Sequence, residues 1–286
     1  MRIDLHTHST ASDGTDTPAE LVRAAHAAGL DVLGVTDHDT TGGWAASAGA
    51  LPAGLTLVRG AEFSCVYLAP DGEQISLHLL GYLFDPDHEG LRSERARLRA
   101  SRLGRGRAIV ANLVADGVPI TWQRVEQLAA GGAVGRPHIG RALVEQGLVP
   151  DVSAAFGELL SSSSKYYVPK ADSDVFDMIG LVRAAGGAPV FAHPLARRRG
   201  PVVDEDVIAQ MRAAGLVGVE TEHPDHAAAD RRRLAGLAAE LGLLATGSSD
   251  YHGSNKATSL GACTTRPEVY EALISRAQAL VPLTAA

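Results

Sequence analysis

The chain has 286 residues, of which 45% are hydrophobic and 21% are charged, and its formal net charge is -7. This composition is typical of an ordinary globular protein and excludes the disordered and fibrous classes. The acidic balance argues against a broad nucleic-acid-coating surface, because neutralising many phosphates requires an excess of Lys and Arg, whereas short or small phosphorylated ligands remain compatible with it.

The cysteine usage predicts a reducing, cytoplasmic environment. Cys65 and Cys263 are too few for a disulfide framework and lack the paired spacing of a thiolate zinc site. We interpret both as small buried hydrophobic residues. The sequence shows no basic leader before an apolar stretch, and no later apolar run is long enough to span a bilayer, so neither export nor a membrane anchor is expected.

Short runs rich in Val, Leu and Ile alternate with Ala-rich stretches of helical period, which is the pattern of βα units on a mostly parallel sheet. Seven runs have the length and composition of buried strands. They are residues 3–6, 32–36, 55–59, 76–82, 188–192, 217–221 and 243–246. Seven strands in this rhythm predict an α/β barrel.

The first helix is predicted from its own start signal. In Thr17-Pro18-Ala19-Glu20, a hydroxyl precedes a proline at the first helical position and a glutamate closes a capping box, and Gly29 ends the helix. The same pattern predicts helices over 174–186, 204–215 and 225–242, each leading into the next strand.

The alternation breaks down between Tyr82 and Lys170. An Arg-rich helical stretch over 89–116 is followed by shorter helical segments separated by glycine-containing breaks. A plain βα connection is much shorter, so we predict an all-helical insertion that caps one end of the barrel. The predicted division is a barrel domain over 1–86 and 167–286 and a helical insertion domain over 87–166.

Ionisable side chains occupy or follow most of the predicted strands. In chain order they are His6, His8, Asp13, Asp37, His38, Asp39, Glu62, His78, His193, Asp250 and His252. The carboxyl ends of parallel barrel strands form one face, so we expect these groups to converge. Any one of them alone would more often cap a turn, but a set of imidazoles and carboxylates without thiolates favours a site for Zn, Mn or Fe.

The spacing of His6 and His8 has a simple geometric explanation. Residues i and i+2 of a strand point the same way, so His6 and His8 can hold one ion from one face, while Asp13 in the following loop can turn back to a second ion.

The other histidines and two acids are predicted to have no part in this site. We interpret His26, His88, His223 and His226 as structural or surface residues. Glu220 and Glu222 are expected to be solvated or salt-bridged.

Four motifs together resemble those of the PHP (polymerase and histidinol phosphatase) family. They are His6-Thr7-His8-Ser9 with Asp13, Thr36-Asp37-His38-Asp39, Ala192-His193-Pro194, and Ser249-Asp250-Tyr251-His252-Gly253. The resemblance implies a distorted seven-stranded β/α barrel that binds up to three divalent metal ions, such as Mn, Zn or Fe, for phosphoester hydrolysis.

The resemblance also implies an assignment of metal ligands by motif position. One ion would be held by His6, His8, Glu62 and Asp250. Glu62 would bridge to a second ion held by His78 and His193, and a third would be held by Asp13, His38 and His252. Some relatives have His where Asp13 stands, so two or three ions per chain are expected.

The insertion is similar to that of the TrpH-like subgroup, in which a helical domain caps the barrel and the substrates are nucleotide phosphates or the 5′-ends of short RNA. This implies substrate-binding roles for Arg136, His138 and Lys165, where Arg would hold phosphate as a bidentate fork and Lys as a point charge. The run 197–199 follows the His193 strand and could also meet a phosphate. The expected partner is a small nucleotide or short oligonucleotide, without an obligate protein partner.

The predicted reaction is hydrolysis by an attacking water. Asp250 would accept the proton of that water, and His193 or a metal would assist the leaving oxygen. Three alternatives stay open: a phosphomonoesterase on histidinol phosphate or another metabolite, a non-catalytic module that binds metal for stability, and amidohydrolase chemistry. The last is disfavoured because no bridging lysine follows a predicted strand.

Overall fold

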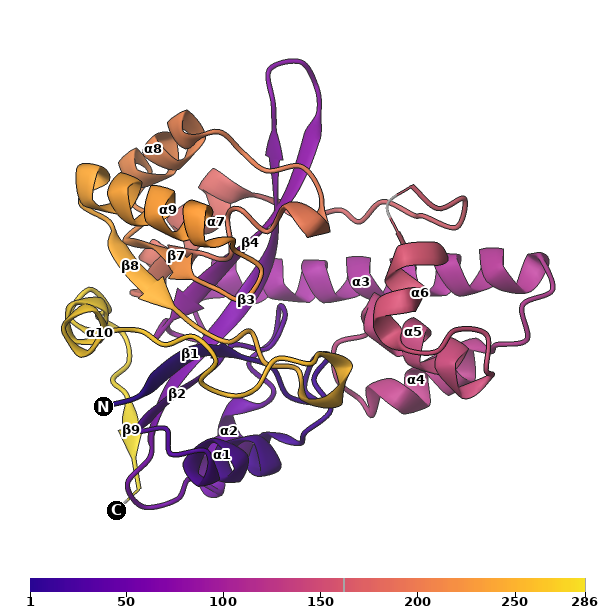
Figure 1. The fold of residues 1–286 in the computed structure, drawn as a ribbon, viewed down its shortest axis with the longest axis horizontal. Coiled ribbons are helices and arrows are strands. Elements are labelled where there is room, and N and C mark those ends of the chain that lie inside the picture. Colours follow the sequence, from indigo (N-terminus) through magenta and orange to yellow (C-terminus); the bar gives the residue numbers. More distant parts are fainter. Residues whose placement is uncertain (162, 286) are drawn as a thin grey trace.

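The computed structural model describes residues 1–161 and 163–285 and contains the predicted seven-stranded barrel (Figure 1). The strands lie in the order β1, β2, β3, β4, β6, β7, β8, with the bounds Ile3–Thr7, Val32–Val35, Thr56–Leu68, Gln74–Tyr82, Ala188–Phe191, Gly218–Glu222 and Leu244–Gly247. The barrel is nearly closed, because Thr7 bridges to Tyr251 just beyond β8. The predicted α/β barrel is therefore confirmed. Two short strands that were not predicted, β5 (Ser173–Asp174) and β9 (Leu283–Thr284), pair with β3.

The prediction of a mostly parallel sheet was wrong around β4, which runs antiparallel to both β3 and β6. β3 and β4 form one long hairpin whose turn is closed by a hydrogen bond from the Ala69 amide to the Glu73 carbonyl at 2.8 Å. A turn this short can join only antiparallel strands. β3 also continues nine residues past the predicted end at Arg59, because Glu62 and Ser64 interrupt the apolar composition without ending the strand.

Helices pack around the outside of the barrel (Figure 1). They are α1 (Pro18–Ala27), α2 (Trp44–Gly49), α7 (Val175–Ala184), α8 (Glu205–Ala213), α9 (Ala228–Leu241) and α10 (Pro267–Ile274). The capping box of Thr17 and Glu20 is present as predicted, and Gly29 has a φ of 73°. α9 begins at Ala228 instead of the predicted 225, because the Asp225 carboxylate binds Arg199.

The segment after β4 is helical as predicted and extends away from the barrel (Figure 1). It contains α3 (Glu89–Ala115), α4 (Trp122–Ala129), α5 (Arg136–Glu145) and α6 (Val152–Glu158). Its apolar cluster includes Ile109, Leu113 and Leu143, whereas Leu91 and Leu98 at the start of α3 pack in the barrel core. α3 thus connects the two cores. Among the described residues, no helix is both long and apolar enough to cross a membrane.

Candidate metal centre

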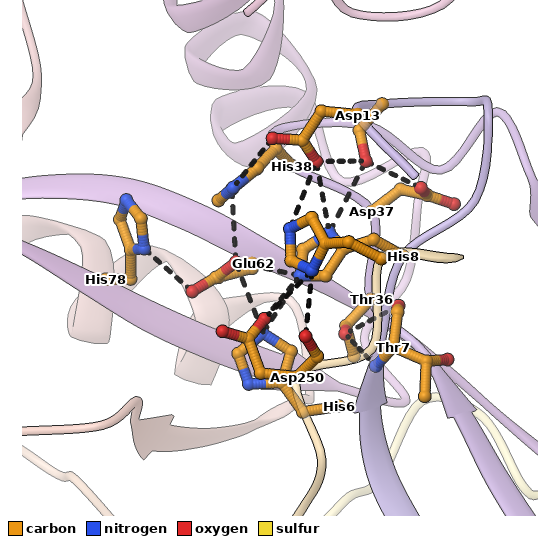
Figure 2. Close-up of polar contacts among 12 residues, drawn as sticks. His6, Thr7, His8, Asp13, Thr36, Asp37, His38, Glu62, His78 and Asp250 are labelled. Carbon is orange, nitrogen blue, oxygen red and sulfur yellow. Dashed lines mark hydrogen bonds and ion pairs between the residues drawn. The ribbon is translucent and has the colours of Figure 1, made fainter. Parts of the chain in front are cut away.

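The carboxyl end of the barrel brings four predicted ligands into one group: His6, His8, Glu62 and Asp250 (Figure 2). The Nε2 atoms of His6 and His8 lie 3.0 Å apart. Glu62 Oε2 lies 3.2 Å from the first and 3.1 Å from the second, and Asp250 Oδ1 lies 3.5 and 3.4 Å from them. All four side chains are buried.

These distances fit a shared cation. Ligand atoms about 2.1 Å from a tetrahedral ion lie about 3.4 Å from one another. The Nε2 atoms of His6 and His8 and one oxygen each of Glu62 and Asp250 all lie close enough together to surround one ion. The residues present therefore fit a divalent metal.

A second group, His8, Asp13, His38 and His252, lies directly beside the first. Asp13 Oδ1 is 3.7 Å from His8 Nδ1 and 3.4 Å from His252 Nε2, and Asp13 Oδ2 is 3.7 Å from His38 Nε2. Because His8 faces the first group with Nε2 and this group with Nδ1, its ring lies between the two positions. The three residues predicted for the third ion are thus brought together, with His8 added.

Glu62 faces both sides of the site, as expected for a bridging carboxylate (Figure 2). Its Oε1 lies 2.7 Å from His78 Nδ1 and 2.9 Å from His193 Nε2, while its Oε2 lies 3.1 Å from His38 Nδ1. Burial favours the neutral acid, but the neighbouring histidines outweigh it and hold the pKa of Glu62 well below its ordinary value. The carboxylate therefore stays ionised, which metal binding requires.

The ligands come from strands β1, β3 and β4 and from the loops that follow the strands. His6 lies in β1 and Glu62 in the middle of β3, while His78 comes from the antiparallel strand β4. The loop from Ser9 to Asp13 is held by Asp37, which accepts hydrogen bonds from the Ser9 amide at 2.8 Å and the Ser12 hydroxyl at 2.7 Å. Asp37 thus shapes the loop that carries Asp13.

Backbone strain is concentrated at this end of the barrel. Among the described residues, five non-glycine residues have a positive φ, and three of them are Asp39 (54°), His193 (31°) and Asp250 (52°). Asp39 is fixed by Arg102 and by a hydrogen bond from the Ser64 amide at 2.8 Å. Strain of this kind persists where the surroundings hold it in place, and it is common at functional sites.

Glu220 is a supporting residue whose place the sequence reasoning missed. It is fully buried on β7, where it lies 3.1 Å from His6 Nδ1 and accepts hydrogen bonds from the His193 amide at 2.8 Å and from the Ser248 hydroxyl. The predicted solvent exposure of Glu220 was wrong, whereas its predicted salt bridge is present, with His6 as the partner. Burial opposes ionisation, yet the His6 charge and hydrogen bond lower the pKa of Glu220 to about 2. Glu220 lies where it can accept the Nδ1 proton of His6, which in a neutral ring would leave Nε2 for a ligand.

Two cations contact the centre from its solvent-accessible side. Arg199 Nη2 and Lys256 Nζ each lie 2.6 Å from Asp250 Oδ2, and both side chains are about one third exposed. Arg199 Nη1 also lies 3.2 Å from His193 Nε2. The basic run 197–199 indicates Arg199 only in general terms, and no predicted site includes Lys256, although its position four residues after His252 is a usable signal.

The environment of His193 opposes its predicted role as a proton donor. Burial and the adjacent Arg199 guanidinium lower the pKa of His193 to about 3, so the ring is neutral. A neutral imidazole can bind a metal but has no extra proton to give. Burial raises the pKa of Asp250 while Lys256 and Arg199 lower it, and the result lies well below its ordinary value.

The three predicted substrate-binding residues lie in different surroundings. His138 is buried at the start of α5 and accepts a hydrogen bond from the Gly135 amide at 3.0 Å. Arg136 is partly buried, donates to the Leu160 carbonyl at 2.9 Å and lies over the Phe156 ring. Lys165 is 70% exposed and pairs with Asp116 at the end of α3. The structure therefore does not bring Lys165 to the metal centre, because Asp116 holds its charge elsewhere.

His223 and His226 are buried, so a surface position was wrong for both, while a structural role for His226 agrees with its contacts. His226 Nε2 accepts from the Leu195 amide at 3.2 Å, and Nδ1 lies 3.0 Å from the Thr221 carbonyl. His223 Nε2 lies 3.5 Å from Asp250 Oδ2, next to the centre. Of the cysteines, Cys65 is buried as predicted and Cys263 is partly exposed.

Similarity to known proteins agrees with this geometry. Residues 4–104 match the PHP domain family. The chain is 33% identical over 252 residues to the 3′,5′-nucleoside bisphosphate phosphatase of Chromobacterium violaceum, with 87% of each protein covered. It is also 33% identical over 252 residues to a 5′-3′ exoribonuclease of Haemophilus influenzae, covering 88% of this chain and 90% of the relative. A phosphoribosyl 1,2-cyclic phosphate 1,2-diphosphodiesterase of Eggerthella lenta is 34% identical over 260 residues, with 87% and 94% covered.

Solved structures give the same fold. A structure from Bifidobacterium adolescentis, assigned as a metal-dependent phosphoesterase, superposes with a TM-score of 0.89 at 35% identity over 96% of both chains. A structure from Chromobacterium violaceum, described as an amidohydrolase with bound sulfate and no metal, gives 0.86 at 29% identity over 100% of this chain and 99% of the other. On its barrel, its strand-end histidines and carboxylates and these relatives, the chain belongs to the PHP domain family of metal-dependent phosphoesterases.

Proposed function

We propose that this protein hydrolyses the 3′-phosphate of nucleoside 3′,5′-bisphosphates and 5′-phosphorylated short oligoribonucleotides. The observation that carries the proposal is the buried group of histidines and carboxylates beside two cations, Arg199 and Lys256, that remain accessible to solvent. Cations next to a metal centre favour an anionic substrate. The phosphatase and exoribonuclease among the relatives support nucleotides as the substrate class.

Manganese is the proposed metal, with zinc or iron as the other candidates, at two or three ions per chain. His6, His8, Glu62 and Asp250 would hold the first ion, and Glu62 would bridge to a second beside His78 and His193. Asp13, His38, His252 and the far nitrogen of His8 would hold a third. When bound, such ions lower the pKa of a coordinated water and neutralise charge on phosphoryl oxygens.

The side chains around the metal centre would have different roles in the reaction. Arg199 and Lys256 would bind phosphoryl oxygens and offset the negative charge that develops as water attacks phosphorus and the bond to the ribose 3′ oxygen breaks. Asp250, which touches both cations, would take the proton of the attacking water. His193 would serve as a ligand, since its ring is neutral.

The test is the release of inorganic phosphate and nucleotide from adenosine 3′,5′-bisphosphate by Mn-loaded protein, with chelator-stripped protein as the control. Metal-dependent formation of 5′-AMP and phosphate is the expected result. A 5′-phosphorylated oligoribonucleotide, histidinol phosphate and a 1,2-cyclic phosphate would be assayed in parallel. Turnover of only one of the last two would replace the proposal with that activity, and turnover of none would leave a non-catalytic metal-binding module.

A further inference from the structure

A groove of about 530 Å³ lies between the barrel and the helical insertion. On the barrel side it is lined by Thr10 and Ala11, from the loop after β1. On the insertion side it is lined by Arg99 and Leu103 of α3 and by the loop that ends in Val134. Its volume lies in the range of sites that take drug-sized or nucleotide-sized ligands.

This groove is continuous with the chain segments that build the metal centre. Thr10 and Ala11 lie between His8 and Asp13, and the Ala133 amide donates to the Ala11 carbonyl at 2.9 Å. One residue beyond Val134, Gly135 approaches the Asp13 carboxylate so closely that a Cβ there would lie 3.9 Å from Oδ2. The groove therefore lies beside the loop that carries Asp13, next to the metal centre.

Arg99 is the cation in this groove that the protein does not neutralise. In the part of the chain that the structure describes, its guanidinium makes one hydrogen bond, to the Asp39 carbonyl at 3.5 Å, and no ion pair within 4.0 Å. One turn later on the same face of α3, Arg102 forms an ion pair with the Asp39 carboxylate. One turn earlier, Arg95 donates hydrogen bonds to the Thr41 hydroxyl and the Pro86 carbonyl. Arg99 is exposed and faces a groove lined by polar residues such as Thr10 and Thr40 as well as by Leu103.

We propose that this groove binds the second nucleotide of a 5′-phosphorylated oligoribonucleotide, with Arg99 paired to the phosphate that follows it. The inference rests on the proposed function and specifies its substrate. Leu103 offers apolar surface to a base or ribose face, the threonines offer hydroxyls to ribose, and the guanidinium can donate two hydrogen bonds to a phosphate. A nucleoside bisphosphate, which has one nucleoside, ends at the metal centre and does not reach Arg99, so the groove selects for chains over mononucleotides.

The first test compares Arg99→Ala with Arg92→Ala on two substrates. Arg92 is exposed, lies seven residues earlier on the same face of α3 and is outside the groove, so it is a matched control for the lost charge. The loss in kcat/KM of Arg99→Ala on 5′-phosphorylated triadenylate should be roughly 10-fold, and at least five times its loss on adenosine 3′,5′-bisphosphate. Equal losses on both substrates, or no loss on either, would overturn the proposal.

A binding measurement separates the groove from the proposed activity. Fluorescence anisotropy of a 3′-labelled 5′-phosphorylated triadenylate with chelator-treated protein reports affinity without turnover. Ala100→Trp, which fills the groove from an exposed position of α3, should weaken binding roughly 10-fold relative to Ala96→Trp, an exposed position one turn outside it. If neither substrate is hydrolysed, the proposed function fails, and equal affinity of the two tryptophan variants would show that the groove proposal fails as well.

Discussion

The barrel and the helical insertion use charged side chains in opposite ways. At the carboxyl end of the barrel, buried histidines and carboxylates face one another, and two imidazole nitrogens approach to 3.0 Å. In the insertion, several exposed charges are neutralised locally, as in the pairs of Arg124 with Glu145 and Lys165 with Asp116. The first arrangement fits a bound cation, whereas the ion pairs of the second are complete as they stand.

This difference separates residues that act on a substrate from residues that only shape the protein. A charged side chain that is already paired within the protein has little charge left to bind a substrate. Arg199 and Lys256 are intermediate, because they pair with Asp250 but remain about one third exposed and can also reach a ligand. The insertion would then contribute mainly shape and Arg99, the cation that lines the groove beside the barrel.

The largest effect is expected from Glu62→Gln. The substitution keeps the size of the side chain but removes the charge that faces His78, His193 and His38, so metal should be lost and turnover should fall about 1000-fold or more. Glu222→Gln is the matched control, because Glu222 is half-exposed and pairs only with Arg231. Phosphate release and bound metal would be measured on both, and a Glu62→Gln enzyme within tenfold of wild type would contradict the bridging role.

Arg199→Ala should have the next largest effect. Loss of a guanidinium that binds phosphoryl oxygens should lower kcat/KM roughly 100-fold while the metal content stays the same. Its neighbour Arg198 is exposed and provides the control variant Arg198→Ala. A parallel loss of metal in Arg199→Ala would instead show that Arg199 acts by holding Asp250.

Glu220→Gln should weaken metal binding more than it slows the metal-saturated enzyme. The amide cannot hold the His6 proton as strongly as the carboxylate, so metal affinity should fall roughly 10- to 100-fold. A metal titration followed by activity would show a shifted midpoint and a similar plateau. A lowered plateau with an unchanged midpoint would mean that Glu220 acts on the reaction and not on His6.

Lys165→Ala should have the smallest effect, with kcat/KM within about twofold of wild type. Its ammonium group is 70% exposed and is held by Asp116, away from the centre. A loss of tenfold or more on adenosine 3′,5′-bisphosphate would show that Lys165 leaves Asp116 to bind substrate, and the contrast between barrel and insertion would then fail.

Much of the barrel site follows from local sequence, because strand ends place side chains predictably. The spacing of His6 and His8 puts both on one face, and their Nε2 atoms do meet. The hairpin of β3 and β4 could not be predicted in the same way: Glu62 and Ser64 break the apolar run, yet they lie in a strand whose polar positions line the site.

The sequence does not predict which charged residues, distant in the chain, pair with each other. Glu220 resembles the solvated Glu222 two residues later, but the register of β7 shifts between them, and the first is buried while the second is exposed. Lys165 and Lys256 are equally plausible phosphate ligands by type, but one pairs with Asp116 and the other with Asp250. These partners are far apart in sequence or set by loop shape, so no local pattern assigns them.

The most direct test of the central claim is the number of manganese ions bound per chain, measured by mass spectrometry of the equilibrated protein beside its Glu62→Gln variant. We expect two or three ions in the wild type and at least one fewer in the variant, because Glu62 touches residues of both neighbouring groups. A wild type that binds no metal, or a variant that binds the same number as wild type, would contradict a centre built around this carboxylate.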